Sequence, residues 1–254
     1  MPIFKGVYII EINKIYNMCC LEGMKEIEDK SIDMILCDLP YGTTACKWDS
    51  IIPFDKLWEQ YNRICRGVIA LTASQPFTTN LIASNMDNFR YELIWDKQVG
   101  MGQNAKRMPI KIHENIVIFY ARPTTYNPQM TDKIHKRPRP TSYKSEIMDL
   151  SSCKRDLKHL ESMKKYPVSI LSLSGRSAEV NSLHRVHPTQ KPVALFEYLI
   201  KTYTNENEIV LDNCMGSGTT AIACINSNRN YIGFELDTGY FNIANERIEQ
   251  VNAL

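Results

Sequence analysis

The chain has 254 residues, of which 44% are hydrophobic and 23% are charged, and this suits one large domain or one domain with an insertion. No stretch reaches the roughly eighteen apolar residues of a membrane helix, and charges interrupt the apolar segment 1–14, so we expect neither a membrane span nor a signal peptide. The eight cysteines form no C-x-x-C pair and the five histidines are scattered. We therefore expect reduced thiols, a cytoplasmic location and no metal site.

The net charge of +2 hides an uneven distribution. Residues 97–191 hold 18 Lys and Arg against 7 Asp and Glu, a net charge of +11, whereas the remainder holds 12 against 21, a net charge of −9. A solvated basic face is one explanation. We favour a surface for a polyanion such as nucleic acid, because the excess is larger than solubility requires.

Short apolar runs alternate with amphipathic helical patterns along much of the chain. In chain order, we expect strands at 6–10, 31–37, 67–73, 91–96, 115–120, 208–212 and 231–236. We expect helices at 54–65, 192–204, 219–227 and 240–251. This alternation predicts an α/β fold with a doubly wound, mainly parallel sheet that helices cover on both faces.

The alternation stops between residues 122 and 185, where proline, serine and basic residues are abundant. We interpret this range as an insertion into an α/β domain formed by 1–121 and 186–254. The insertion is the expected region for reading a nucleic-acid target, and its basic residues include Lys136, Arg137, Arg139, Lys154, Arg155, Lys158, Lys164 and Lys165.

The segment 208–236 has the pattern of a strand, a glycine loop, a helix and a second strand that ends in an acid. The loop from Gly216 to Gly218 lets the backbone approach a ligand, and Glu235, nineteen residues after Gly216, can bind ribose hydroxyls. No lysine follows the second glycine, which excludes a nucleoside-triphosphate loop. The pattern permits NAD, S-adenosylmethionine or a plain glycine turn, but Asp212 at the end of the first strand favours a ligand with a cationic amine.

A second motif, "DLPY" at 38–41, ends the predicted strand at 31–37. In isolation, Asp38 would be interpreted as a helix N-cap and Tyr41 as a core aromatic.

The two motifs together resemble a known family. "DLPY", "LTASQPF" at 71–77, "HPTQKP" at 187–192 and "DNCMGSGTT" at 212–220 are similar to segments of the amino-methyltransferases that modify exocyclic nitrogens in DNA. The catalytic motif precedes the cofactor loop, an order that resembles the permuted beta group. The resemblance covers nearly the whole chain except about 122–185.

This resemblance implies a Rossmann-like, circularly permuted methyltransferase fold, S-adenosylmethionine as cofactor and double-stranded DNA as partner. The amino group of a flipped-out base would donate to the Asp38 carboxylate and the Leu39 main-chain carbonyl, while Pro40 fixes the turn and the base stacks on Tyr41. The cofactor residues implied are Asp212, Gly216, Gly218, Thr219, Thr220 and Glu235, with His187, Thr189 and Lys191 closing over the methionine end.

An aspartate at the head of the motif resembles the adenine-N6 members, so we expect methylation of adenine N6, with cytosine N4 as the alternative. The sequence departs from the family pattern at Leu39, which replaces a proline, and at Asn213-Cys214, which replaces the more usual Pro-Phe. Cys19 stands where an acidic residue is frequent in the family. That acid is thought to help hold an adenine edge, so substrate or cofactor affinity would be affected here.

Two other functional classes stay open. A DNA-binding partner that retains the fold without turnover is supported by Cys19, and a nicotinamide-dependent oxidoreductase is permitted by the glycine loop. The oxidoreductase leaves "DLPY" and the basic insertion unexplained. Members of the family often dimerise, so a homodimer is a further expectation.

Overall fold

A computed structural model describes five parts of the chain, residues 9–42, 50–100, 105–132, 164–173 and 190–253. They belong to two compact units, a larger one within 1–127 and 169–254 and a smaller one within 128–168. In the smaller unit, β6 (Thr131–Asp132) pairs antiparallel with β7 (Lys164–Lys165).

The larger unit is built on an eight-stranded sheet. In spatial order its strands are β1 (Lys14–Asn17), β10 (Asn230–Glu235), β9 (Ile209–Asp212), β2 (Ile32–Cys37), β3 (Cys65–Ala73), β5 (His113–Phe119), β4 (Phe89–Asp96) and β8 (Ile170–Ser172). The first five run parallel, β5 is antiparallel to β3 and β4, and β8 is parallel to β4. β2 is buried at all of its positions, as is typical of a parallel strand covered on both faces.

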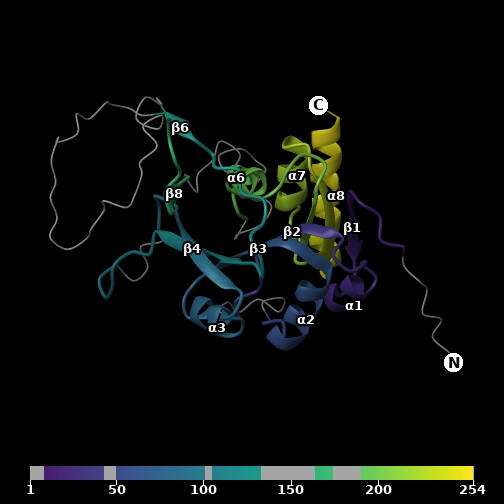
Figure 1. Cartoon of the computed structure of the whole chain (residues 1–254), viewed down its shortest axis with the longest axis horizontal. Coiled ribbons are helices and arrows are strands. Elements are labelled where there is room, and N and C mark those ends of the chain that lie inside the picture. Colours follow the sequence, from purple (N-terminus) through teal and green to yellow (C-terminus); the bar gives the residue numbers. More distant parts are fainter. Residues whose placement is uncertain (1–8, 43–49, 101–104, 133–163, 174–189, 254) are drawn as a thin grey trace, which may run out of the picture. The chain divides into compact units, whose positions relative to one another are not determined.

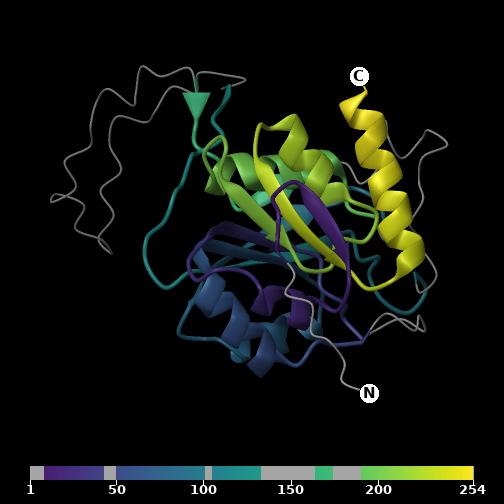
Figure 2. The same ribbon diagram turned by 90° about the vertical axis from the view of Figure 1, so that its right-hand side faces the viewer.

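Helices cover both faces of the sheet, as Figures 1 and 2 show. One face carries α1 (Cys20–Lys25), α2 (Phe54–Ile64) and α3 (Phe77–Ala83), and the other carries α6 (Val193–Tyr203), α7 (Thr219–Asn226) and α8 (Thr238–Asn252). Alternate β2 side chains point to opposite faces, so Ile35 packs with the first helix layer and Leu36 with the second. The predicted doubly wound α/β fold is confirmed.

Six of the seven predicted strands and all four predicted helices are present. The prediction of a strand at 6–10 is wrong for residues 9 and 10, which lie outside any strand, and residues 6–8 are outside the described part. The sheet begins instead at β1, which pairs with β10 alone and has one buried side chain, so its sequence lacks a strong apolar signal.

The range interpreted as an insertion contributes β8 to the main sheet, while the division into two domains stays a prediction. Within the described segments, every helix is too short or too polar to cross a lipid bilayer.

Gly67 lies in a bulge between β2 and β3. The register passes from Ile32 opposite Cys65 to Met34 opposite Val68, so two β3 residues face Asp33 alone. A Cβ added at Gly67 would lie 1.8 Å from the main-chain oxygen of Asp33, so the backbone of a larger residue must shift.

We therefore expect Gly67→Ala to lower the free energy of unfolding by about 3 kcal/mol, measured by urea denaturation. The control Glu59→Ala, on the exposed side of α2, should stay within about 0.5 kcal/mol of the parent protein. Equal stability of Gly67→Ala and the parent would contradict this account of the bulge.

Candidate active site

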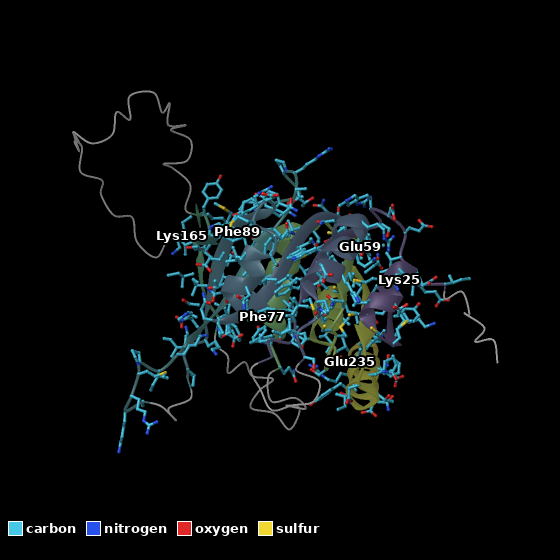
Figure 3. The ribbon with its side chains drawn as sticks, turned by 90° about the horizontal axis from the view of Figure 1, so that it is seen from below. Lys25, Glu59, Phe77, Phe89, Lys165 and Glu235 are labelled. Atoms are coloured by element: carbon cyan, nitrogen blue, oxygen red, sulfur yellow. The ribbon has the colours of Figure 1, made fainter. Side chains whose placement is uncertain are left out.

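The predicted catalytic and cofactor motifs meet at the carboxyl ends of parallel strands. Asp38 follows β2 and Asp212 ends β9. Glu235, which is labelled in Figure 3, ends β10 just before α8. β9 pairs in parallel with both β2 and β10, which brings the three carboxylates to one edge of the sheet. Ligands of open α/β sheets bind beyond this edge.

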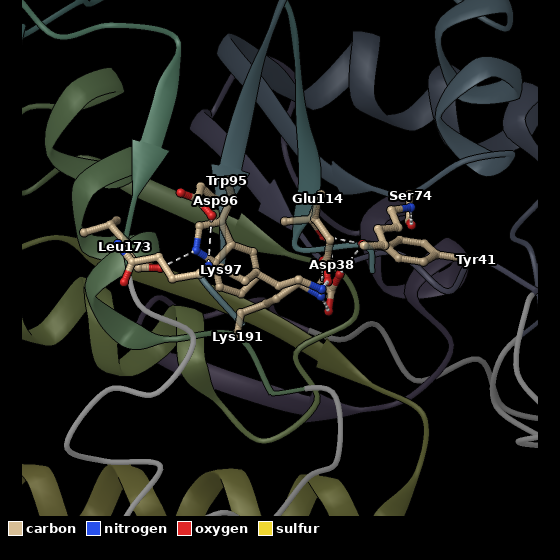
Figure 4. Close-up of polar contacts among 12 residues, drawn as sticks. Asp38, Tyr41, Ser74, Trp95, Asp96, Lys97, Glu114, Leu173 and Lys191 are labelled. Atoms are coloured by element: carbon tan, nitrogen blue, oxygen red, sulfur yellow. Dashed lines mark hydrogen bonds and ion pairs between the residues drawn. The ribbon is translucent and has the colours of Figure 1, made fainter. Parts of the chain in front are cut away.

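Three side chains donate to the Asp38 carboxylate. Its Oδ1 accepts from the Thr72 hydroxyl and, at 2.9 Å, from the Tyr41 hydroxyl, while Oδ2 accepts from Lys191 Nζ at 2.7 Å (Figure 4). Thr72 is adjacent because β2 and β3 pair in parallel with Cys37 opposite Leu71. A carboxylate can accept about four hydrogen bonds, so the chain orients this one and leaves capacity for a further donor.

Tyr41 is fixed at both ends of its side chain. Its ring stacks on Phe77 of α3, with ring centres 5.1 Å apart and planes 29° apart, and its hydroxyl also lies 3.0 Å from Thr72 Oγ1. Burial, reinforced by the Asp38 charge, raises the pKa of Tyr41 well above its usual value. The phenol therefore stays neutral and can donate to Asp38.

Charges of alternating sign continue from Asp38 into the sheet. Lys191 Nζ lies 3.3 Å from Glu114 Oε2, and Lys97 Nζ lies 2.9 Å from Glu114 Oε1. Burial opposes the charge on Lys191, but the nearby carboxylates of Asp38 and Glu114 outweigh it and raise the pKa of this lysine. Burial likewise opposes the charge on Glu114, but the two lysines lower its pKa. Lys191 and Glu114 are therefore both charged at neutral pH.

Asp212 is a buried carboxylate at the start of the glycine loop. It is 2% exposed and accepts from the Cys214 amide at 3.0 Å and from the Thr220 hydroxyl. Burial raises the pKa of Asp212 to about 6, although these donors favour the charged form. A cation beside Asp212 would relieve this cost.

The glycine loop adopts a backbone that disfavours other residues. Gly216 and Gly218 have φ angles of +55° and +85°, and a Cβ on Gly218 would lie 3.1 Å from that of Ala244 in α8. Glu235 accepts from the Gly216 amide at 2.7 Å and from the Asp237 amide at 2.8 Å, so it holds the loop and retains acceptor capacity. Burial raises the pKa of Glu235.

Asn213 and Cys214, which depart from the family pattern, join the loop to the first helix layer. The Tyr61 hydroxyl of α2 donates to Asn213 Oδ1. The Asn213 amide in turn donates to Cys20 Sγ at 3.7 Å and to Cys214 Sγ at 3.5 Å. Polar contacts thus anchor this turn.

Comparison with known proteins identifies the family. The family model of N6/N4 methyltransferases, described as DNA methylase, matches residues 32–246. The chain belongs to this DNA methyltransferase family. The resemblance inferred from the sequence motifs is thereby confirmed.

Relatives align along almost the whole chain. The type II methyltransferase M1.MboII of Moraxella bovis is 29% identical over 258 residues, which cover 96% of this chain and 99% of the relative. The crystal structure of the M1.HpyAVI–SAM complex is 24% identical, with a TM-score of 0.63 over 92% of this chain and 98% of that one. The structure of the cytosine-N4-specific PvuII DNA methyltransferase is 15% identical, with a TM-score of 0.64 over 97% of this chain and 93% of that one. These structures share the methyltransferase fold.

The structure brings together part of the predicted methyltransferase site. Asp38 contacts Tyr41 and Lys191, and the intervening Leu39 is buried while Pro40 is half-buried. Lys191 pairs with the carboxylates described above, and its closure over the cofactor stays a prediction.

Several predicted residues lie outside the described part of the chain. They are His187, Thr189, Lys136, Arg137, Arg139, Lys154, Arg155 and Lys158.

Sequence reasoning assigned no role to Thr72, Phe77 or Glu114. Thr72 and Phe77 lie in "LTASQPF", which resembles a family segment, so this motif could have indicated that they belong to the site. Glu114 is an acid near the start of a buried strand, and only the fold shows that it reaches Lys191.

The pKa of Asp212 predicts a pH-dependent stability. The native pKa of about 6 exceeds the usual 3.8, so this carboxyl contributes stability that is complete below pH 3.8 and is lost as the pH rises through 6. We expect the free energy of unfolding of the parent to fall by about 2 kcal/mol relative to Asp212→Asn between about pH 4.5 and 7, measured with urea. If the free energy of unfolding of the parent and of Asp212→Asn changed with pH in parallel, the raised pKa of Asp212 would be contradicted. Asp237→Asn, which alters the N-cap of α8, should keep the parent's profile.

Proposed function

We propose that the chain is a site-specific DNA methyltransferase that methylates N6 of adenine, using S-adenosylmethionine, in a base flipped out of double-stranded DNA. The observation that carries the proposal is the Asp38 carboxylate, oriented by Thr72, Tyr41 and Lys191 at the sheet edge that also holds the glycine loop. Members of the same family named type II methyltransferases support a role in restriction–modification.

The task of Asp38 follows from the chemistry of a ring amine. The amino lone pair is delocalised into the base, so the nitrogen is a poor nucleophile. The Asp38 carboxylate and the Leu39 main-chain carbonyl accept hydrogen bonds from the two amino N–H groups and direct the lone pair outward. Positive charge then develops on this nitrogen, and a preorganised carboxylate stabilises it without reorganisation.

The base itself needs a surface outside the duplex. Extrusion from DNA costs a few kcal/mol, and stacking on Tyr41 offsets part of this cost. Phe77 already covers the Tyr41 ring on one side, which fixes the ring plane for the incoming base.

The residues of the glycine loop fit S-adenosylmethionine. The cofactor supplies an electrophilic methyl group on a sulfonium. Buried Asp212 suits its cationic amine, Glu235 retains capacity for ribose hydroxyls, and the backbone of Gly216 and Gly218 permits close approach. Thr219 and Thr220 begin α7 beside the loop, and His187, Thr189 and Lys191 would close over the methionine end.

The aspartate at the head of the motif supports adenine as the target. Cytosine N4 is the second candidate, because the similar PvuII structure is described as cytosine-N4-specific. In this chain either reaction would use the Asp38 carboxylate, so the modified base must be identified directly.

Incubation with unmethylated DNA and methyl-labelled S-adenosylmethionine, followed by digestion to nucleosides, tests the proposal. We expect label in N6-methyldeoxyadenosine. Label in N4-methyldeoxycytidine alone would overturn the choice of adenine as the target base. No incorporation of label into DNA would overturn the proposed methyltransferase activity. Asp38→Asn should lower kcat by about a hundredfold or more, because it removes the charge and keeps the shape. Because this variant leaves buried Lys191 without one of its partners, its activity is compared with that of the parent at a temperature where circular dichroism shows both proteins to be folded.

Binding to DNA should depend steeply on salt. We propose that the region 122–185 supplies phosphate contacts, and six of them would weaken binding about a thousandfold between roughly 50 and 200 mM salt. Replacing Lys136, Arg137 and Arg139 by Gln should reduce the slope of log affinity against log salt by about 3. The control Lys56→Gln, on the exposed side of α2, should leave it unchanged. Equal slopes in the triple variant and the parent would reject this assignment.

A further inference from the structure

The Lys191 ammonium occupies the position that the proposed reaction requires for the target amino group. Its Nζ donates to Asp38 Oδ2 at 2.7 Å and lies over the Tyr41 ring, 5.7 Å from the ring centre. These are the two groups that hold the amino group and the base plane in the proposed mechanism. Lys191 is 7% exposed, so this contact is part of the packed interior.

The ammonium and the reacting nitrogen compete electrostatically. As the methyl group transfers, positive charge develops on the amino nitrogen beside Asp38. A second cation held on the same carboxylate would oppose this charge and would occupy the oxygen that the amino group needs. The lysine would therefore slow the reaction if it stayed on Asp38.

Glu114 offers the lysine a second partner. Its Oε2 is buried, makes no hydrogen bond of ordinary geometry within the described part of the chain, and lies 3.3 Å from Lys191 Nζ. Its Oε1 is held by Lys97 at 2.9 Å, which fixes the carboxylate (Figure 4). A small shift of Nζ from Asp38 to Glu114 keeps the ammonium paired inside the protein.

We propose, on the basis of the proposed function, that Lys191 holds the place of the target amino group in the DNA-free protein and moves onto Glu114 when the base enters. The exchange replaces one hydrogen bond to Asp38 by another and moves no proton. Glu114 is a positioning residue, since it acts through Lys191. Asp38 thus stays paired until a base is present.

A double-mutant cycle tests this exchange. Glu114→Gln removes the charge that receives the lysine, so the ammonium should remain on Asp38 and obstruct the base. We expect kcat/KM for unmethylated DNA at saturating cofactor to fall about tenfold, a change of about 1.4 kcal/mol. In the Lys191→Met background nothing needs to be displaced, so adding Glu114→Gln should change kcat/KM by less than about threefold.

Base extrusion can be measured directly, and a purely structural role of Glu114 would not change it in a way that Lys191→Met reverses. With 2-aminopurine at the modified position and sinefungin present, Glu114→Gln should reduce the fluorescence increase on binding, and Lys191→Met should restore it. Glu92→Gln is the matched control, because Glu92 lies on the adjacent β4 and binds Asn115 instead. It should match the parent in both measurements.

The outcomes separate the exchange from the proposed function. Failure of the parent to transfer label to DNA overturns the proposed function. If the parent is active, a Glu114→Gln defect of equal size with and without Lys191 overturns the exchange alone.

Discussion

The Asp38 carboxylate and its pairing with Lys191 are the interaction on which the site depends. The lysine is buried, so its charge must be balanced inside the protein. Removing one partner of such a pair typically costs about 3–5 kcal/mol, because the other charge is left uncompensated. Glu114 and Lys97 extend the balance to four groups, and the proposed exchange is possible because two carboxylates share one ammonium.

The parallel sheet makes this arrangement possible. Asp38 and Lys191 are 153 residues apart in the sequence, and the glycine loop follows both of them. β2 nevertheless lies between β9 and β3, so its carboxyl end is adjacent both to Asp212 and to Thr72. The permuted order of motifs therefore leaves the geometry of the site intact.

The departures from the family pattern affect packing more than chemistry. Asn213 accepts a hydrogen bond from Tyr61 and donates one to Cys20, and so holds the turn before the glycine loop against two helices. Leu39 is buried, and the proposed mechanism uses only its main chain. Cys19 is exposed at the N-cap of α1 without a side-chain capping bond, so an acid at this position would also have a helix to cap.

The sequence by itself determined the α/β class, the long strands and helices, and the two motifs, because burial on both faces and glycine turns leave local patterns. It missed β1, β8, α1 and α3, which are short, so their existence depends on neighbours more than on local propensity. Only the tertiary structure decided that Lys191 binds Asp38 and Glu114, because strand order and register bring distant side chains together. No local pattern records such contacts, since each partner is an ordinary charged residue in its own segment.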